Sequence, residues 1–232
     1  MSRLSLEAKR AVEIALGAAI ARRAGGDSQA AAQMLEAAAE LLQRATELDK
    51  AERAALLQSL LEVQVEMQKW DAALNSSDEL LQLAPRHHFA LEARATAQLH
   101  SGRIDEAAQT LRALLQISPR DPLHRLKYAT LLQLQDKSGE ALREFARVAQ
   151  SFPDAPFASD ARDAIEMLDS MQIQQILMRA SEQTYFRLEL QRELDETLAQ
   201  HGFDLSEAGR ESLRHIVDDG RPPSENIAPR VH

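Results

Sequence analysis

Four histidines come closest, in this sequence, to a pattern that could bind a metal ion. His87, His88, His100 and His124 fall near the predicted junction between two helix pairs. A metal centre needs ligands that converge on one point with fixed spacing. His87 and His88 are adjacent, so their side chains point apart on a helix. The sequence therefore predicts ordinary surface histidines, with no metal site and no cofactor.

Other catalytic patterns are missing as well. The chain has no Cys, which excludes disulfides, thiolate metal sites and a cysteine nucleophile. The one Gly pair, Gly25-Gly26, suits a helix turn rather than a phosphate-binding loop. No Ser lies in the Gly-x-Ser-x-Gly pattern of a nucleophile elbow. We therefore predict no catalytic residues and no intrinsic enzyme activity.

Composition and charge restrict the partners. The 232 residues contain 36 Asp and Glu against 27 Lys and Arg, a net charge of −9. This acidic balance argues against a nucleic-acid partner, which would require a cationic surface. No segment reaches the ~20 apolar residues that span a bilayer, and acidic residues precede the short apolar stretch Ile14–Ala21. We expect no membrane partner and a cytoplasmic location.

Prolines reveal a repeat in the elements that must position any binding surface. Pro85, Pro119 and Pro153 are each separated by 34 residues. Twelve residues before each proline stands a small residue, which allows two helices to approach closely: Ala73, Ala107 and Ala141. The corresponding helix starts fall at Trp70, Ile104 and Ser138-Gly139. A fixed period of this length indicates stacked helix pairs, each of which buries its apolar face against its neighbours.

The repeat resembles the tetratricopeptide repeat (TPR) family, whose unit is 34 residues. In the central unit the matching positions are Leu91, Ala95, Gly102, Ile104, Ala107, Leu111, Leu114 and Pro119. The resemblance implies an all-α fold, a right-handed superhelical solenoid of antiparallel helix pairs with a C-terminal helical extension. The predicted repeats are residues 54–87, 88–121 and 122–155.

The flanking segments are predicted to be helical too. Residues 1–53 form a degenerate TPR-like pair whose second helix begins at Gly26-Asp27 and runs to about Leu48. Residues 156–217 contain a capping helix, Phe157–Ser170, with Pro156 at its first position, followed by further helices. His201-Gly202 predicts a helix stop, and Asp204 with Glu207 predicts the next start. The Pro-rich segment 218–232 is predicted to be a flexible tail.

The TPR resemblance also implies a concave groove lined by the first helix of each pair. The family positions fall on Gln58, Glu62, Val65, Phe89, Glu92, Thr96, Leu99, Leu126, Lys127, Thr130 and Gln133. Lys127 is the single cation among them, so a clamp for a peptide carboxyl terminus is not indicated. A helix or an extended peptide is the expected ligand. The alternative is that these residues are simply solvated, or are covered by the chain's own C-terminal helices.

The C-terminal segment also resembles the helical leader regions of Nif11-like and nitrile-hydratase-type ribosomal peptide precursors. Gln175-Ile176-Leu177, Phe186-Arg187 and Gly202-Phe203 carry this resemblance. It implies docking of a peptide-modifying enzyme, for which the candidate residues are Leu177, Phe186, Arg187 and Leu190. Two alternatives stay open: a helical hairpin that packs on the last repeat, and a dimerisation element.

Three functions follow from these patterns. The first is a non-enzymatic scaffold that binds a protein or peptide in the groove. The second is a recruitment protein or precursor whose leader-like helices dock a modifying enzyme. The third is a structural module that forms a homodimer through the C-terminal helices.

Overall fold

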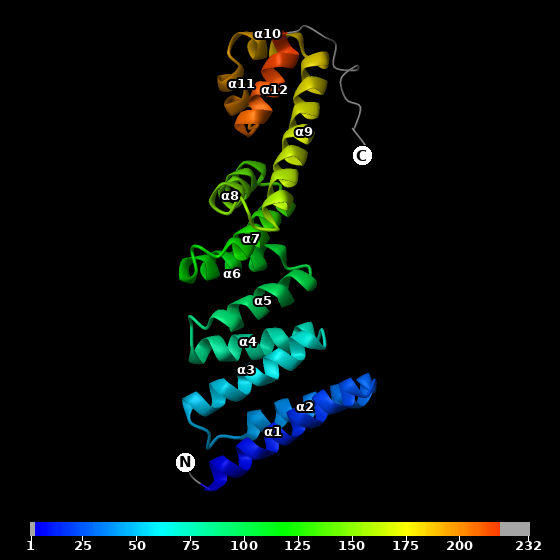
Figure 1. Cartoon of the computed structure of the whole chain (residues 1–232), viewed down its shortest axis with the longest axis vertical. Coiled ribbons are helices and arrows are strands. Elements are labelled where there is room, and N and C mark those ends of the chain that lie inside the picture. The colour runs from blue at the N-terminus through cyan, green and yellow to red at the C-terminus, as the bar shows by residue number, and fades with distance from the viewer. Residues whose placement is uncertain (1–2, 219–232) are drawn as a thin grey trace. The chain divides into compact units, whose positions relative to one another are not determined.

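The structure, a computed structural model, describes residues 3–218 and, within that range, contains twelve α-helices and no strand (Figure 1). The helices form two compact units, which we call unit 1 (residues 1–120) and unit 2 (residues 121–232). The predicted tail lies outside the described residues, except for Asp218 at the end of the last helix. The all-α fold of TPR-like helix pairs with a C-terminal helical extension is confirmed.

Unit 1 consists of three consecutive helix pairs. They are α1 (Arg3–Ala24) with α2 (Ser28–Arg44), α3 (Lys50–Glu66) with α4 (Trp70–Leu83), and α5 (His88–His100) with α6 (Ile104–Ile117). The predicted helix starts at Trp70 and Ile104 are confirmed. The small residues Ala73 and Ala107 are fully buried, which lets the helices of a pair approach closely. Apolar side chains at three- and four-residue spacing complete the core.

A left-handed residue ends the first helix of each repeat. Gln68, Gly102 and Asp136 occupy the same repeat position, with φ of 56°, 72° and 58°. The amide of the next residue then turns back to a carbonyl in the last turn of the helix, as in Arg103 N–H to Gln98 O at 2.9 Å. Only one of the three turns has the glycine that tolerates this conformation without strain.

The degenerate first pair differs from its predicted boundaries. Helix α2 is capped by Asp27 as expected, but it ends at Arg44 rather than near Leu48. Helix α3 starts at Lys50, one turn before the predicted repeat boundary, because Asp49 and Glu52 form a capping box. This Asp-x-x-Glu signal is visible in the sequence, and it accounts for the shift in both boundaries.

Unit 2 begins with the last repeat pair, α7 (Pro122–Leu134) and α8 (Ser138–Ser151), followed by the 25-residue helix α9 (Ala158–Glu182). The start of α9 is at Ala158, with Phe157 as its N-cap, so Pro156 is not its first residue. The first half of α9 packs on α7 and α8 through Ala161 and Leu168. The predicted end near Ser170 is wrong, because α9 continues for three further turns (Figure 1).

The second half of α9 builds another core with α10 (Thr184–Arg192), α11 (Leu194–Gln200) and α12 (Glu207–Asp218). We call these three helices, together with residues 172–182, the C-terminal bundle. Its buried side chains are Ile176, Leu177, Ala180, Phe186, Leu190, Leu198, Leu205 and Leu213. The predicted stop is confirmed, since α11 ends at Gln200 and Gly202 has φ of 73°. The C-terminal helices therefore pack mainly on α9, rather than as a hairpin on the last repeat.

Among the described residues, no helix is both long enough and apolar enough to cross a bilayer.

Candidate partner-binding surfaces

The predicted groove residues of unit 1 recur at three- and four-residue spacing along α3 and α5, two helices that are in contact. Gln58, Glu62 and Val65 come from α3. Phe89, Glu92, Thr96 and Leu99 come from α5. We call these seven residues the unit 1 face. Their side chains are half-buried or exposed, and Leu99 is 42% exposed despite being apolar. The face therefore offers apolar contact area that is open to a partner.

Polar groups of the unit 1 face are partly held in place within it. The Gln58 amide donates to Glu62 Oε1 at 2.9 Å, and the Thr96 hydroxyl donates to the Glu92 carbonyl at 2.9 Å. Glu62 and Glu92 make the face acidic, and none of its seven residues is a Lys or Arg. Such a face would attract a partner that presents cations or N–H donors.

In unit 2, the remaining predicted groove residues lie on α7. Leu126, Lys127 and Gln133 are half-buried, and Thr130 is exposed. The Thr130 hydroxyl donates to the Leu126 carbonyl at 3.0 Å. Leu134, one residue beyond this set, is 59% exposed. Helix α7 by itself therefore presents a mixed polar and apolar surface like that of unit 1.

Two side-chain contacts lie at the starts of the second helices α4 and α6. Trp70 at the start of α4 stacks on His100 at the end of α5, with ring centroids 4.1 Å apart and nearly parallel planes. Trp70 therefore packs the start of α4 against the end of α5. Before α6, Arg103 Nε donates to Glu106 Oε1 at 2.6 Å. This hydrogen bond holds the pKa of Glu106 below its ordinary value and raises that of Arg103.

The leader-like residues lie mostly inside the C-terminal bundle. Leu177, Phe186 and Leu190 are 5%, 2% and 2% exposed, so these side chains hold the bundle together. The Phe186 ring also lies under the Arg179 guanidinium, 4.7 Å from the ring centroid. Arg187 alone of the four candidates is at the surface. An enzyme that docks on this bundle would meet Arg187 and the exposed neighbours of the buried three.

Polar side chains of α9 hold the segment that leads into α12. Asp169 Oδ1 accepts the Ser206 N–H at 2.8 Å, and Asp169 Oδ2 accepts the Ser206 hydroxyl. Gln172 makes two bonds to the backbone of Asp204, at 2.9 and 2.6 Å. Both α9 side chains are at most 7% exposed. We call Asp169 and Gln172 with residues 204–206 the latch.

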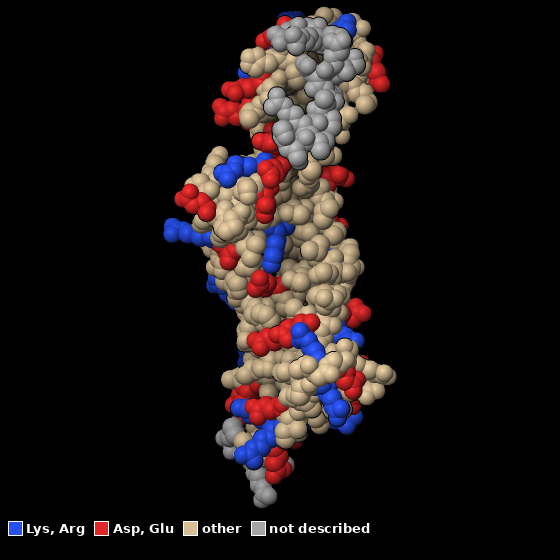
Figure 2. Space-filling view, turned by 45° about the vertical axis from the view of Figure 1, so that its right-hand side comes forward, with Lys and Arg blue, Asp and Glu red and all other residues tan. Residues whose placement is uncertain are grey.

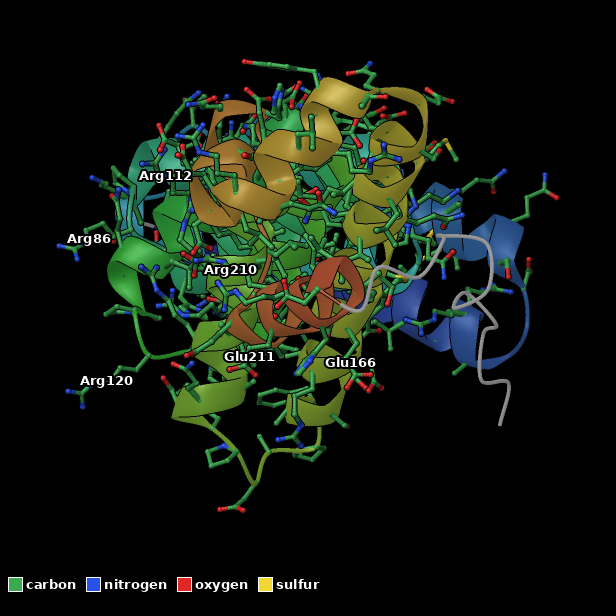
Figure 3. The ribbon with its side chains drawn as sticks, turned by 90° about the horizontal axis from the view of Figure 1, so that it is seen from above. Arg86, Arg112, Arg120, Glu166, Arg210 and Glu211 are labelled. Atoms are coloured by element: carbon green, nitrogen blue, oxygen red, sulfur yellow. The ribbon has the colours of Figure 1, made fainter. Side chains whose placement is uncertain are left out.

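A cleft that the sequence did not reveal lies beside the latch. It has a volume of about 450 Å³ and is lined by Leu142, Arg143 and Ala146 of α8 and by Leu205, Ser206 and Arg210 near the start of α12, among others. Figure 3 labels Arg210 and Glu211 on α12. No local motif could have predicted this cleft, because its walls are about sixty residues apart in the chain.

Charge is mixed over the repeats. Figure 2 shows acidic and basic side chains interspersed over the visible face of unit 1, without a large patch of one sign. Ion pairs such as Arg53–Glu79 and Arg94–Asp78 account for part of this mixture. On this face of unit 1, the acidic side chains are therefore not gathered into a single tract.

Solved structures with a similar arrangement of helices include TPR proteins. The chain is similar to a TPR protein from Parabacteroides merdae, with a TM-score of 0.55 and 18% identity, covering 90% of this chain and 74% of that one. It is also similar to YrrB, a TPR protein with an unusual peptide-binding site, with a TM-score of 0.52 and 19% identity over 66% and 75% of the chains. The chain has the TPR fold.

Further comparisons agree at the level of the fold. A double mutant of MamA RS-1 matches with a TM-score of 0.51 and 12% identity, covering 89% of this chain and 96% of that one. Sperm-associated antigen 1 of Mus musculus is 34% identical over 62 residues, 27% of this TPR-fold chain. The chain spans only 7% of that relative's length. No family model matches the chain.

Proposed function

We propose that this chain is a non-enzymatic scaffold that binds a protein or peptide partner through the first helices of its TPR-like pairs. The observation that carries the proposal is the unit 1 face, where Leu99 is 42% exposed and Phe89 is half-buried, with Glu62 and Glu92 on the same face. Apolar side chains surrounded by polar groups match the make-up of protein interfaces, which have an apolar centre and a polar rim. YrrB, of the same fold, has a peptide-binding site, which supports this use of the fold.

The chemistry of the unit 1 face defines the partner class. Phe89 and Leu99 supply apolar contacts, while Glu62 and Glu92 favour a segment that carries Lys or Arg. On α7 the surface differs, because Lys127 adds a positive charge beside Leu126. A peptide with apolar anchors and mostly basic flanking residues fits the unit 1 face best.

A comparative pull-down with the full chain tests the proposal. Phe89→Ala and Glu92→Lys should each reduce the recovery of bound proteins at least fivefold, measured by quantitative mass spectrometry against the unchanged chain. Gln109→Ala on α6 is the matched control, because it alters an exposed side chain on a second helix. If all three variants recover bound proteins as well as the unchanged chain does, binding through the unit 1 face is refuted.

A second candidate function rests on the C-terminal bundle. Helices α10–α12 share a core with the second half of α9. We propose, from the leader-like residues, that this bundle recruits a peptide-modifying enzyme. Mass spectrometry of the chain after co-expression with such an enzyme tests this idea. A tail that stays unmodified and full-length argues against the precursor role, whereas loss of enzyme binding in an Arg187→Glu variant supports recruitment.

The predicted homodimer through the C-terminal helices is the third proposal. Tyr185 and Leu188 on α10 are 75% and 56% exposed, and a second copy could cover them. Light scattering over a hundredfold range of concentration distinguishes the states. A monomer throughout that range would exclude the homodimer.

A further inference from the structure

Helix α9 carries an apolar stripe that neither the repeats nor the C-terminal bundle covers. Met167, Met171 and Met178 are 49%, 52% and 56% exposed. At 100° per residue, Met171, Gln174 and Met178 all lie within about 40° of Met167 around the helix. We call these four residues the methionine stripe. It spans twelve residues, or about 17 Å along the axis. It belongs to α9, which is not one of the first helices proposed above to bind a partner.

The stripe is bordered by negative charge. Asp160, Asp163, Glu166 and Glu182 are all exposed on α9 and lie within about 100° of Met167. Figure 3 labels Glu166, which points outward from α9. The two cations of α9 lie elsewhere. Arg162 is about 140° from Met167, and Arg179 donates to Gln183 and covers Phe186. The methionine stripe therefore has an acidic border without a basic side chain of its own helix.

We propose that the methionine stripe binds a basic amphipathic helix of a partner protein. Methionine side chains are flexible and polarisable, so an exposed row of them adapts to apolar residues of different shapes. A straight stripe of three helical turns matches the apolar face of another helix at i, i+3, i+4 and i+7. The carboxylates beyond the two ends of the stripe, Asp160 and Asp163 before it and Glu182 after it, then lie within reach of Lys or Arg near the ends of that helix.

A second copy of this chain fits the stripe poorly. In an antiparallel pair centred on the stripe, Met167 faces Met178 of the other copy, and Asp163 faces its Glu182. In a parallel pair each carboxylate faces its own equivalent. Like charges in direct opposition are unfavourable at an interface. The acidic border therefore selects a cationic partner over self-association through α9.

Fluorescence anisotropy with the full chain tests this inference. The probe is a labelled 16-residue Leu/Lys peptide with its leucines on one helical face. Two control peptides replace Lys by Glu, or scramble the order so that no apolar face forms. The double variants Met171→Gln/Met178→Gln and Asp163→Asn/Glu182→Gln should each raise the Kd at least tenfold. Neither control peptide should bind comparably.

A matched control separates this surface from the proposed first-helix surface. Leu134→Gln changes a side chain of similar exposure at the end of α7, and it should leave the Kd within twofold. An unchanged Kd in both double variants, or an equal loss in Leu134→Gln, would overturn the inference. So would light scattering that shows a dimer which Met171→Gln/Met178→Gln dissociates. Failure of the pull-down variants at Phe89 and Glu92 has no bearing on this result.

Discussion

At the scale of single residues, the repeat turns carry strain that the sequence does not relieve in every copy. Gln68 and Asp136 adopt the left-handed conformation that Gly102 adopts at the same repeat position. For a non-glycine residue this conformation costs roughly 1–2 kcal/mol. The turn itself imposes this conformation, because the amide after each of these residues bonds back to the helix: Lys69 N–H to Gln64 O and Lys137 N–H to Leu132 O, both at 2.9 Å.

Glycine at these two positions should stabilise the fold. Gln68→Gly and Asp136→Gly each remove that strain, offset by about 0.4–1 kcal/mol for the freer unfolded chain, so we expect a net gain of about 0.5–1 kcal/mol. The reverse change, Gly102→Gln, should cost a similar net amount, about 0.5–1 kcal/mol. Urea unfolding followed by circular dichroism measures all three. A loss of stability in both glycine variants would contradict the strain.

At Gly139 a side chain is excluded by lack of space rather than by backbone conformation. An added Cβ there would lie 1.9 Å from Asp204 Oδ2 and 2.8 Å from Asp204 Cβ, at the contact between α8 and the latch. Gly139→Ala should cost about 1–3 kcal/mol from overpacking, which exceeds the gain of about 1 kcal/mol in helix propensity.

A double-mutant cycle with Asp204→Gly isolates that clash, because the second change removes the obstructing side chain. We expect the two substitutions to be coupled by at least about 1 kcal/mol. Strictly additive free energies of unfolding would show that α8 and the segment before α12 do not meet at this point.

At the scale of elements, the latch fixes where α12 begins. The sequence predicts Asp204 as the N-cap, but the Ser206 hydroxyl accepts the Gly209 N–H at 3.0 Å, so Ser206 caps the helix. Asp204 is instead engaged through its backbone by Gln172. Gln172, 32 residues away, therefore holds Asp204 outside the helix, a contact that no local pattern reveals, whereas the Ser206 cap is a local signal.

Gln172→Ala tests the latch as an element-level contact. Losing two part-buried hydrogen bonds to the Asp204 backbone should cost about 1–3 kcal/mol in the C-terminal bundle. Hydrogen exchange should become faster for α12 amides while α3–α6 amides keep their protection. Gln175→Ala, an exposed change one turn further along α9, is the control. Unchanged exchange in α12 would mean that the apolar core alone holds it.

The repeat helices were predictable from the sequence, whereas the end of α9 was not. Pro85 and Pro119 break the backbone pattern locally, and the starts at Trp70 and Ile104 follow from them. Helix α9 has no such stop, because its interior changes packing partners from α8 to α10–α12 without a change in local propensity. The placement of the groove residues on first helices follows from the repeat, whereas exposure of the methionine stripe depends on tertiary packing.

At the scale of the whole chain, we expect three regions that unfold separately. They are unit 1 and, within unit 2, the last repeat with the first half of α9 and the C-terminal bundle. The C-terminal bundle has its own core, which shares only α9 with the last repeat. In repeat proteins, stability is close to a sum of local and nearest-neighbour terms. A defect in the bundle should therefore leave unit 1 almost unaffected.

Phe186→Ala tests this independence. Phe186 is 2% exposed at the centre of the bundle core, so its truncation should cost about 3–5 kcal/mol, enough to unfold α10–α12 at low urea. Trp70 is the sole tryptophan, and its emission reports on the α4–α5 contact in unit 1. Far-ultraviolet circular dichroism should show an added early transition, while the midpoint of Trp70 fluorescence stays unchanged.

Leu188→Ala, an exposed position on α10, is the control and should add no early transition to the circular dichroism unfolding curve. If the Trp70 midpoint falls together with the circular dichroism signal, the chain unfolds as one cooperative unit, and the bundle stabilises the repeats that present the proposed binding face.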